Sequence, residues 1–514
     1  MDILALDTIL IILGYLKPKD ILNLRLVNKF FNKIIKENEL DINITIKEKI
    51  NERNINIFLN SHKFLNLTFY DVNINESAEY LQYCRKITLY STNIKPECFK
   101  KLINCHSIYI TRLDKSINKI LKNIKNINKC KKIDLVNVNL NKKSAKLINL
   151  INLESLTINY CNLFNFLNNL NSTTIKSLKL FTKNKRYFKK FVISCKLPNL
   201  EILRFGAKMN IDDIKIICKN FPKLKQLFLV YDDNDSNFIK CLSKLEYLET
   251  LELYIIDTDT DFSDFAGLKN LQYLKINGTY KMKISTTCSL KNLTYLEIYY
   301  YRDLSNKFYI EFPSLKTIKT EVLFEIMNVF KFPNIESLLL CESYTSLAFS
   351  SELEKLSKMF INLDAIYLNF VDLSRTDISD KEIEILNRFN LKYLNLKFCK
   401  LTDKSLEIMN FPNLEYLNIS YNDNISNKGV LKLKAPKLKH LELEFCYITT
   451  ELFELLQMPR LCYINVSYCR LNEDLIEILD RRYKDFPYLK KIKIRSKNIK
   501  RKPTKYDSLV LKNN

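Results

Sequence analysis

The sequence predicts an α/β fold: a solenoid with one long parallel β-sheet, preceded by a small all-helical segment. The first observation is a motif that recurs about every 24 residues. It has two apolar residues three apart and another two further on, as in Leu391, Leu394 and Leu396. The second is a proline two residues before many of these motifs, and the third is a non-repetitive apolar stretch at the start of the chain. The motif spacing is that of leucine-rich repeats, in which each unit adds one strand and one returning segment.

The motif predicts about 19 repeats, and the first four have Cys or His where later repeats have Leu or Ile. The first positions are His62, Cys84, Cys105, Cys130, Leu153, Ile175, Leu200, Leu224, Leu248, Leu271, Leu293, Leu315, Ile335, Leu363, Leu391, Leu414, Leu438, Leu461 and Leu489. Eight of the eleven prolines lie two residues before one of these starts. Since proline ends a helix and favours extended geometry before it, each predicts the turn into a strand. Thr402 predicts the N-cap of a helix on the returning segment.

Four repeats continue with an aromatic residue and then a cysteine: Cys161, Cys399, Cys446 and Cys469. Leucine-rich repeats place Asn or Cys here, where a buried polar group bonds the backbone of the loop. These repeats therefore resemble the cysteine-containing subclass, and we expect the cysteines to be structural. No C-x-x-C pair occurs and the chain has only three histidines, so we expect neither a metal nor another cofactor.

Aromatic residues recur at two outward-facing positions of the C-terminal repeats, and aromatic rows are typical binding anchors. At the third position they are Tyr393, Tyr416, His440 and Tyr463. At the eighth position they are Phe398, Tyr421, Phe445 and Tyr468. Both rows are continuous only in residues 391–470, so we expect a substrate to bind there. The alternative is that these rings are structural, those at the eighth position filling the loop layer beside the cysteines.

The chain of 514 residues has a formal net charge of +24, with lysines spread along its whole length. No nucleic-acid motif accompanies them, so we expect a solvated lysine-rich surface and not a nucleic-acid partner. No apolar run is long enough for a membrane span, and we expect no membrane partner. We place the protein in the cytoplasm or the nucleus, with reduced thiols.

The first forty residues predict two or three short helices. Ile9, Ile12, Leu13 and Leu16 form one helical stripe, and Pro18 ends it. A second helix follows, with its apolar residues continuing to Ile35. So many apolar residues must pack on the first repeats or on a partner.

This segment resembles an F-box. The positions that match the family pattern, or are close substitutes, are Leu4, Asp7, Ile12, Leu13, Leu16, Asp20, Ile21, Val27 and Lys29. Ala5 replaces the usual proline, and Phe31 stands where tryptophan is usual. An F-box followed by cysteine-type repeats resembles the F-box/leucine-rich-repeat family. The expected boundaries are 1–40 for the F-box, 41–61 for a linker or cap, 62–496 for the solenoid and 497–514 for a basic tail.

The resemblance implies a non-catalytic substrate receptor of a Skp–cullin–F-box ubiquitin ligase, which binds a Skp-family adaptor, a cullin–RING ligase through it, and an unknown protein substrate. The implied adaptor-binding residues are Leu4, Ile9, Ile12, Leu13, Leu16 and Val27. Two alternatives stay open: these residues cap the solenoid, or the chain is an interaction scaffold or pathogen factor without ligase coupling. No catalytic motif was found that would indicate an enzyme.

Overall fold

The computed structural model describes residues 42–46, 65–70, 73–74, 79–91, 93–112, 117–124, 129–149, 151–161, 166, 170–181, 195–299, 308–320, 330–340, 370–375, 378–495 and 510–511. The chain divides into two compact units, Met1–Ile256 and Asp257–Asn514. The predicted F-box lies outside the described residues. The predicted domain boundaries stay a prediction.

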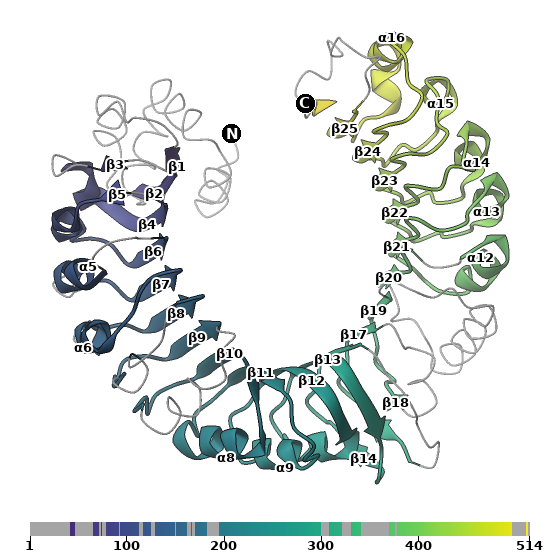
Figure 1. Ribbon diagram of the computed structural model, residues 1–514. Helices are drawn as coiled ribbons and strands as arrows, with labels where there is room; N and C mark the ends of the chain where they lie inside the picture. The colour runs from purple at the N-terminus through teal and green to yellow at the C-terminus, as the bar shows by residue number, and fades with distance from the viewer. Residues whose placement is uncertain are drawn as a thin grey trace, which may run out of the picture. The chain divides into compact units, whose positions relative to one another are not determined.

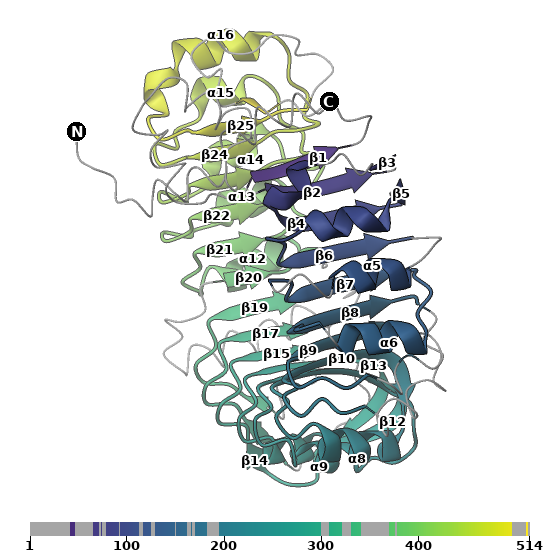
Figure 2. The same cartoon turned by 90° about the vertical axis from the view of Figure 1, so that its left-hand side faces the viewer.

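The first unit is a stack of parallel strands in chain order, each hydrogen-bonded to the next (Figures 1 and 2). The strands are β1 (Ile42–Ile46), β2 (Leu65–Tyr70), β4 (Cys84–Tyr90), β6 (Ser107–Thr111), β7 (Lys132–Val136), β8 (Ser155–Asn159), β9 (Ser177–Phe181), β10 (Ile202–Met209), β11 (Gln226–Tyr231) and β12 (Thr250–Asp261). The returning segments carry the short pair β3 (Asn73–Ile74) and β5 (Asn93–Ile94), and the helices η1 (Glu79–Tyr83), η2 (Pro96–Lys101), α5 (Ile117–Ile124), α6 (Lys142–Asn149), α8 (Ile211–Asn220) and α9 (Phe238–Leu242). Each coil of this unit is thus one strand and one returning segment, as the motif predicts.

The second unit repeats this construction. Its main strands are β13 (Tyr273–Lys283), β15 (Tyr295–Ile298), β17 (Thr317–Thr320), β19 (Ser337–Leu340), β20 (Phe370–Asp372), β21 (Tyr393–Asn395), β22 (Tyr416–Asn418), β23 (His440–Glu442), β24 (Tyr463–Asn465), β25 (Lys491–Lys493) and β26 (Val510–Leu511). The early coils return through η4 (Phe262–Gly267) and a parallel three-stranded sheet of β14 (Cys288–Ser289), β16 (Ile310–Glu311) and β18 (Phe330–Lys331). Later coils return through α12 (Asp380–Leu386), α13 (Asp403–Ile408), α14 (Asn427–Lys432), α15 (Leu452–Leu455), α16 (Asp474–Arg481) and η5 (Tyr483–Asp485). In these later coils the helices lie opposite the strands (Figure 1).

The core of each coil lies between its strand and its returning segment. Leu391, Leu394 and Leu396 are at most 1% exposed, as the motif predicts for positions one, four and six. Cys84 takes the place of the first leucine in its repeat and is fully buried. The side chains between them face outward because successive residues of a strand point to opposite faces of the sheet. The leucine-rich-repeat fold class is confirmed.

Two predicted repeats were placed wrongly, those at His62 and at Leu363. In β2, Leu67 lies beside Ile87 and Phe69 beside Leu89, so this repeat starts two residues after His62. The other error arises because two overlapping motifs satisfy the same spacing, the predicted one starting at Leu363 and a second one starting at Leu368. The structure uses the second: β20 pairs with β19 and β21, so Phe370 lies beside Tyr393. Only this register puts Ile378 and the capping-box residue Ser379 where other repeats have Leu401 and Thr402. Phe370 is therefore a third-position residue, and not the eighth-position residue that the first register implied.

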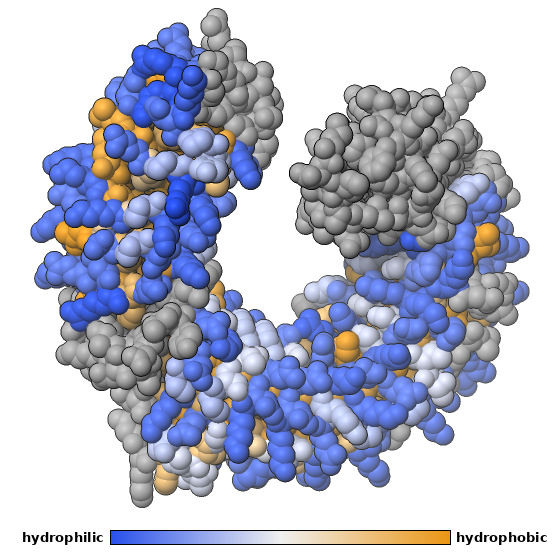
Figure 3. Space-filling model, turned by 180° about the vertical axis from the view of Figure 1, so that it is seen from behind, coloured by the Kyte–Doolittle hydropathy of each residue, from blue (hydrophilic) through white to orange (hydrophobic). Residues whose placement is uncertain are grey.

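The described surface is mostly hydrophilic. In the space-filling view, hydrophilic side chains cover most of the described surface and apolar patches interrupt it (Figure 3). Over the described residues, no helix combines the length and apolar character that a bilayer crossing requires.

Candidate functional site

The third-position aromatics form a row across β21 to β24, which we call the strand row: Tyr393, Tyr416, His440 and Tyr463. Each is the first residue of its strand, and their Cα atoms are direct partners in the parallel ladder. Tyr393 and Tyr416 stack with ring centroids 4.2 Å apart. His440 lies 6.2 Å from the ring of Tyr416 and 5.7 Å from that of Tyr463. The sheet spacing thus brings together four rings that lie 23 or 24 residues apart in sequence.

The eighth-position aromatics form a second row just beyond the strand ends, which we call the turn row: Phe398, Tyr421, Phe445 and Tyr468. Successive centroids are 4.1, 4.7 and 4.5 Å apart. Phe398, Phe445 and Tyr468 are 42–46% exposed, so these rings do not fill the loop layer. All four residues have a left-handed backbone with φ between 57° and 60°. Residues with bulky side chains are uncommon in this backbone region, and each costs about 1–2 kcal/mol of stability there. Exposing the ring to solvent does not recover this free energy.

Buried thiols and one buried amide stabilise this turn by hydrogen bonds to the backbone of the preceding repeat. The Sγ of Cys446 donates to the carbonyl of Ile419 at 3.3 Å, and that of Cys469 donates to the carbonyl of Leu443 at 3.1 Å. Asn422 takes the same place in its repeat and donates to the carbonyl of Leu396 at 3.0 Å. Burial raises the pKa of Cys446 to about 12, so it remains a thiol donor. The predicted structural role of these cysteines is confirmed.

A polar strip separates the two rows and contains two half-buried carboxylates, Glu442 and Glu444, which we call the acid pair. The Nδ2 of Asn465 donates to both, at 2.6 Å to Glu442 and 3.3 Å to Glu444. The hydroxyl of Tyr421 donates to Glu444 at 3.3 Å. Burial and then the charge of Glu442 raise the pKa of Tyr463, so this hydroxyl also stays protonated. The strip therefore offers negative charge framed by rings on both sides.

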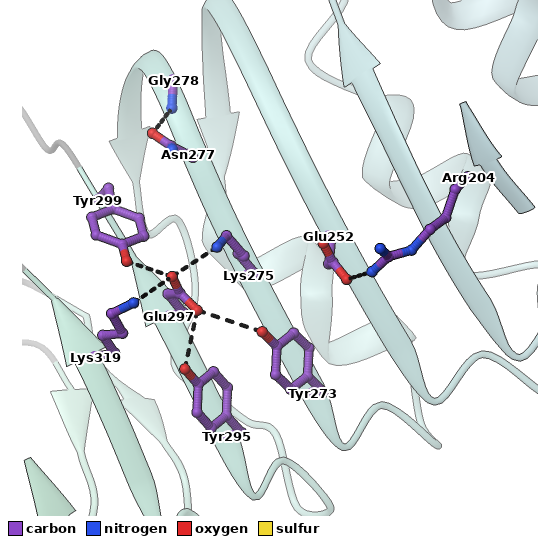
Figure 4. Close-up of polar contacts among 10 residues, drawn as sticks. All are labelled: Arg204, Glu252, Tyr273, Lys275, Asn277, Gly278, Tyr295, Glu297, Tyr299 and Lys319. Atoms are coloured by element: carbon purple, nitrogen blue, oxygen red, sulfur yellow. Dashed lines mark hydrogen bonds and ion pairs between the residues drawn. The ribbon is translucent and has the colours of Figure 1, made fainter. Parts of the chain in front are cut away.

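A second polar centre, which the sequence analysis missed, lies on the outward face of β13, β15 and β17 (Figure 4). Glu297 is 3% exposed and accepts hydrogen bonds from Lys275 at 2.8 Å and Lys319 at 3.2 Å. The hydroxyls of Tyr273, Tyr295 and Tyr299 also donate to this carboxylate. Burial alone would raise the pKa of Glu297, but the hydrogen bonds and the positive charge of Lys275 lower it from 4.5 to about 2.

The predicted substrate-binding residues thus lie together in two adjacent rows, whereas the predicted adaptor-binding residues lie outside the described part of the chain. Lys275, Glu297 and Lys319 occupy the fifth position of three successive predicted repeats. Writing the repeats in register would have revealed this alternation of charge. Where the structure describes the chain, no cluster of three or more His, Cys, Asp or Glu residues is suited to hold a metal ion.

Comparisons with known protein families match two parts of the chain. The sequence profile described as "F-box domain" matches residues 1–43. The profile described as "Leucine Rich repeat" matches residues 389–407 and 412–434, which include Tyr393, Phe398, Tyr416 and Tyr421. The chain's sequence has no significant match among curated proteins.

Solved structures share the fold at low sequence identity. The mouse RP105/MD-1 complex matches with a TM-score of 0.50 and 17% identity, covering 88% of this chain and 86% of the other. The TLR13–ssRNA13 complex matches with a TM-score of 0.43 and 15% identity, over 87% and 84% of the two chains. An internalin (InlF) of Listeria monocytogenes matches with a TM-score of 0.31 and 19% identity, over 55% and 83%. The first of these likenesses supports the fold alone.

Proposed function

Since the chain combines an N-terminal F-box domain with leucine-rich repeats, as F-box/leucine-rich-repeat proteins do, we propose that it is the substrate-recognition subunit of a Skp–cullin–F-box ubiquitin ligase. The F-box would bind a Skp-family adaptor and, through it, a cullin–RING ligase. The outward sheet face of residues 391–470 would bind a protein substrate. The observation that carries the proposal is the F-box match at residues 1–43.

The receptor itself needs no catalytic residues under this proposal, because the ligase supplies the chemistry. Buried thiols such as Cys446 and Cys469 have raised pKa values and serve as hydrogen-bond donors, which suits a structural role. Free thiols are also what proteins of reducing compartments carry, and all the described cysteines are free. On that basis we propose the cytoplasm or the nucleus as its location.

The test is a charge placed in the predicted adaptor interface. Burying one Leu or Ile is worth about 1.5–3 kcal/mol. Replacing Ile12→Asp and Leu16→Asp together should therefore abolish co-purification of the full chain with a Skp-family adaptor and cullin. The repeats should stay folded, because each repeat packs on its neighbours.

The control is Lys17→Asp with Lys19→Asp, which changes charge in the same segment without removing an apolar side chain and should leave co-purification intact. If the Ile12/Leu16 variant still co-purifies with adaptor and cullin, the ligase proposal is wrong. The chain would then be the scaffold without ligase coupling.

A further inference from the structure

Outward-facing carboxylates on these sheets can be neutralised by the chain's own cations. On the first unit, the guanidinium of Arg204 pairs with Glu252 (Figure 4). The same guanidinium lies 5.9 Å from the ring centroid of Phe228, on the strand between them. The sheet face thus holds an arginine by a carboxylate and an aromatic ring at once, a favourable setting for a guanidinium.

On the second unit, Glu297 is neutralised in the same way by lysines. Lys275 and Lys319 bond its carboxylate from the two neighbouring strands, and their ammonium groups lie 5.7 and 5.6 Å from the ring of Tyr299. Here again, a carboxylate at the fifth position lies beside an aromatic ring and pairs with cations of the chain. At both centres, a carboxylate on the outward sheet face therefore binds a lysine or arginine side chain of the chain itself.

The acid pair has the same combination of carboxylate and aromatic rings, but the described residues give it no ion pair. Glu442 lies at the fifth position between the strand row and the turn row, and Glu444 lies two residues on. Within the part of the chain that the structure describes, no lysine or arginine forms an ion pair with either carboxylate. Arg495, which senses the charge of Glu444, donates instead to the hydroxyl of Tyr468 at 3.4 Å.

The rings around the acid pair already hold cations at the margins of the site. Lys397 lies 5.4 Å from the ring of Phe398 and 4.7 Å from that of Tyr421. Lys491 lies 5.4 Å from the ring of Tyr463. Lysines of the chain thus lie against one end of each row, so rings of both rows accept positive groups.

We propose that the acid pair and the rings of Tyr416, Tyr421, Tyr463 and Tyr468 bind an arginine or lysine side chain of a protein partner. The site deepens the proposed function, since it would read an exposed basic segment of the substrate. Charge complementarity selects this occupant, because two carboxylates repel an acidic segment, and stacked rings favour a cation over a neutral polar group.

The test uses the purified full chain and a fluorescent peptide of alternating glycine and arginine, read by fluorescence anisotropy at 0.15 M salt. The net charge of the chain repels this peptide, so binding would report a local acidic site. Glu442→Gln with Glu444→Gln should weaken binding about tenfold, because both charges are lost while the amides keep the shape. Tyr416→Ala with Tyr463→Ala should weaken it separately, since the carboxylates remain but their aromatic frame is gone.

The matched control is Glu415→Gln with Glu454→Gln, which removes two carboxylates that already pair with Lys439 and Arg481. It should leave the peptide affinity within about twofold of the parent chain. The inference is overturned if the parent chain does not bind the peptide, or if the test and control variants lose affinity equally. Because no adaptor is present, these outcomes are independent of the ligase proposal, which the Ile12/Leu16 variant decides.

Discussion

At the scale of single residues, the main finding is that the same side-chain types have different roles in neighbouring repeats. Glu297 and Glu442 both occupy the fifth position, yet Glu297 is closed by two lysines and three tyrosines whereas Glu442 faces outward without a cation among the described residues. Removing a buried carboxylate that has a full set of donors destabilises a fold, because its cations are left unpaired. Half-buried carboxylates that lack a cation are costly unless a partner supplies one.

Replacing Glu297→Gln should destabilise the second unit by on the order of 2 kcal/mol, because Lys275 and Lys319 lose their counter-charge. The pKa of Glu297 falls from 4.5 to about 2 in the folded state. A lowered pKa stabilises the fold above about pH 4.5, and this contribution is lost as the pH falls towards 2. The difference in urea midpoint between parent and variant should therefore shrink over that pH range.

The control for this change is Glu311→Gln, an exposed glutamate of the same unit, which should leave the midpoint nearly unchanged. A Glu297→Gln variant as stable as the parent chain at pH 7 would show that the lysines gain nothing from the carboxylate.

At the scale of elements, hydrogen bonds between successive helix starts set the packing of the returning segments. Asp403 at the start of α13 accepts from the backbone N–H of Ser426 at 2.7 Å and from its hydroxyl at 2.5 Å. Ser426 is the N-cap of α14, so one carboxylate joins two helices. Gly429 sits directly against Asp403, and a Cβ there would lie 2.8 Å from the Cα of Asp403. The close approach of the helices therefore requires glycine at this position.

Gly429→Ala should lower stability by roughly 1–3 kcal/mol, because the new methyl group forces α14 away from Asp403. This strain exceeds the gain of about 1 kcal/mol that alanine brings to a helix interior. Thermal unfolding of the variant measures the balance, and Lys428→Ala, an exposed change on the same helix, is the control. A variant more stable than the parent would mean that α14 can shift freely.

At the scale of the whole molecule, the two proposed activities belong to different parts of one chain. The F-box match covers residues 1–43, and the acid pair belongs to the repeat of β23. Repeat proteins pass little strain between units that are not neighbours, because each repeat contacts only the adjacent ones. Substrate binding and ligase coupling should therefore be separable by mutation.

The Ile12/Leu16 double variant should lose the adaptor but bind the arginine peptide as the parent chain does. The Glu442/Glu444 double variant should lose peptide binding but retain the adaptor, with an unchanged or slightly higher melting temperature because like charges are removed. Both assays run on the same preparations. Loss of both activities in either variant would show that the two segments fold as one unit.

Much of this architecture is readable from the sequence because the leucine motif fixes which side chains point inward. The buried places of Leu391, Leu394 and Cys446 follow from that motif alone. The start of the repeat at Leu368 does not follow from the motif, since two overlapping motifs satisfy the same apolar spacing. Only the pairing of β20 with β19 and β21 distinguishes them. The Glu297 centre was not predicted from the sequence for a related reason. Its lysines become neighbours only when three strands align in register.

The buried thiols have one more consequence. A thiol reacts with an alkylating reagent as the thiolate, and burial raises the pKa of Cys130, Cys195, Cys218 and Cys446 to about 12. Each of these cysteines should therefore be labelled only when its own coil opens. Because they are distributed along both units, the chain carries a natural series of chemical reporters. The order in which iodoacetamide reaches them would map, coil by coil, where the solenoid starts to come apart.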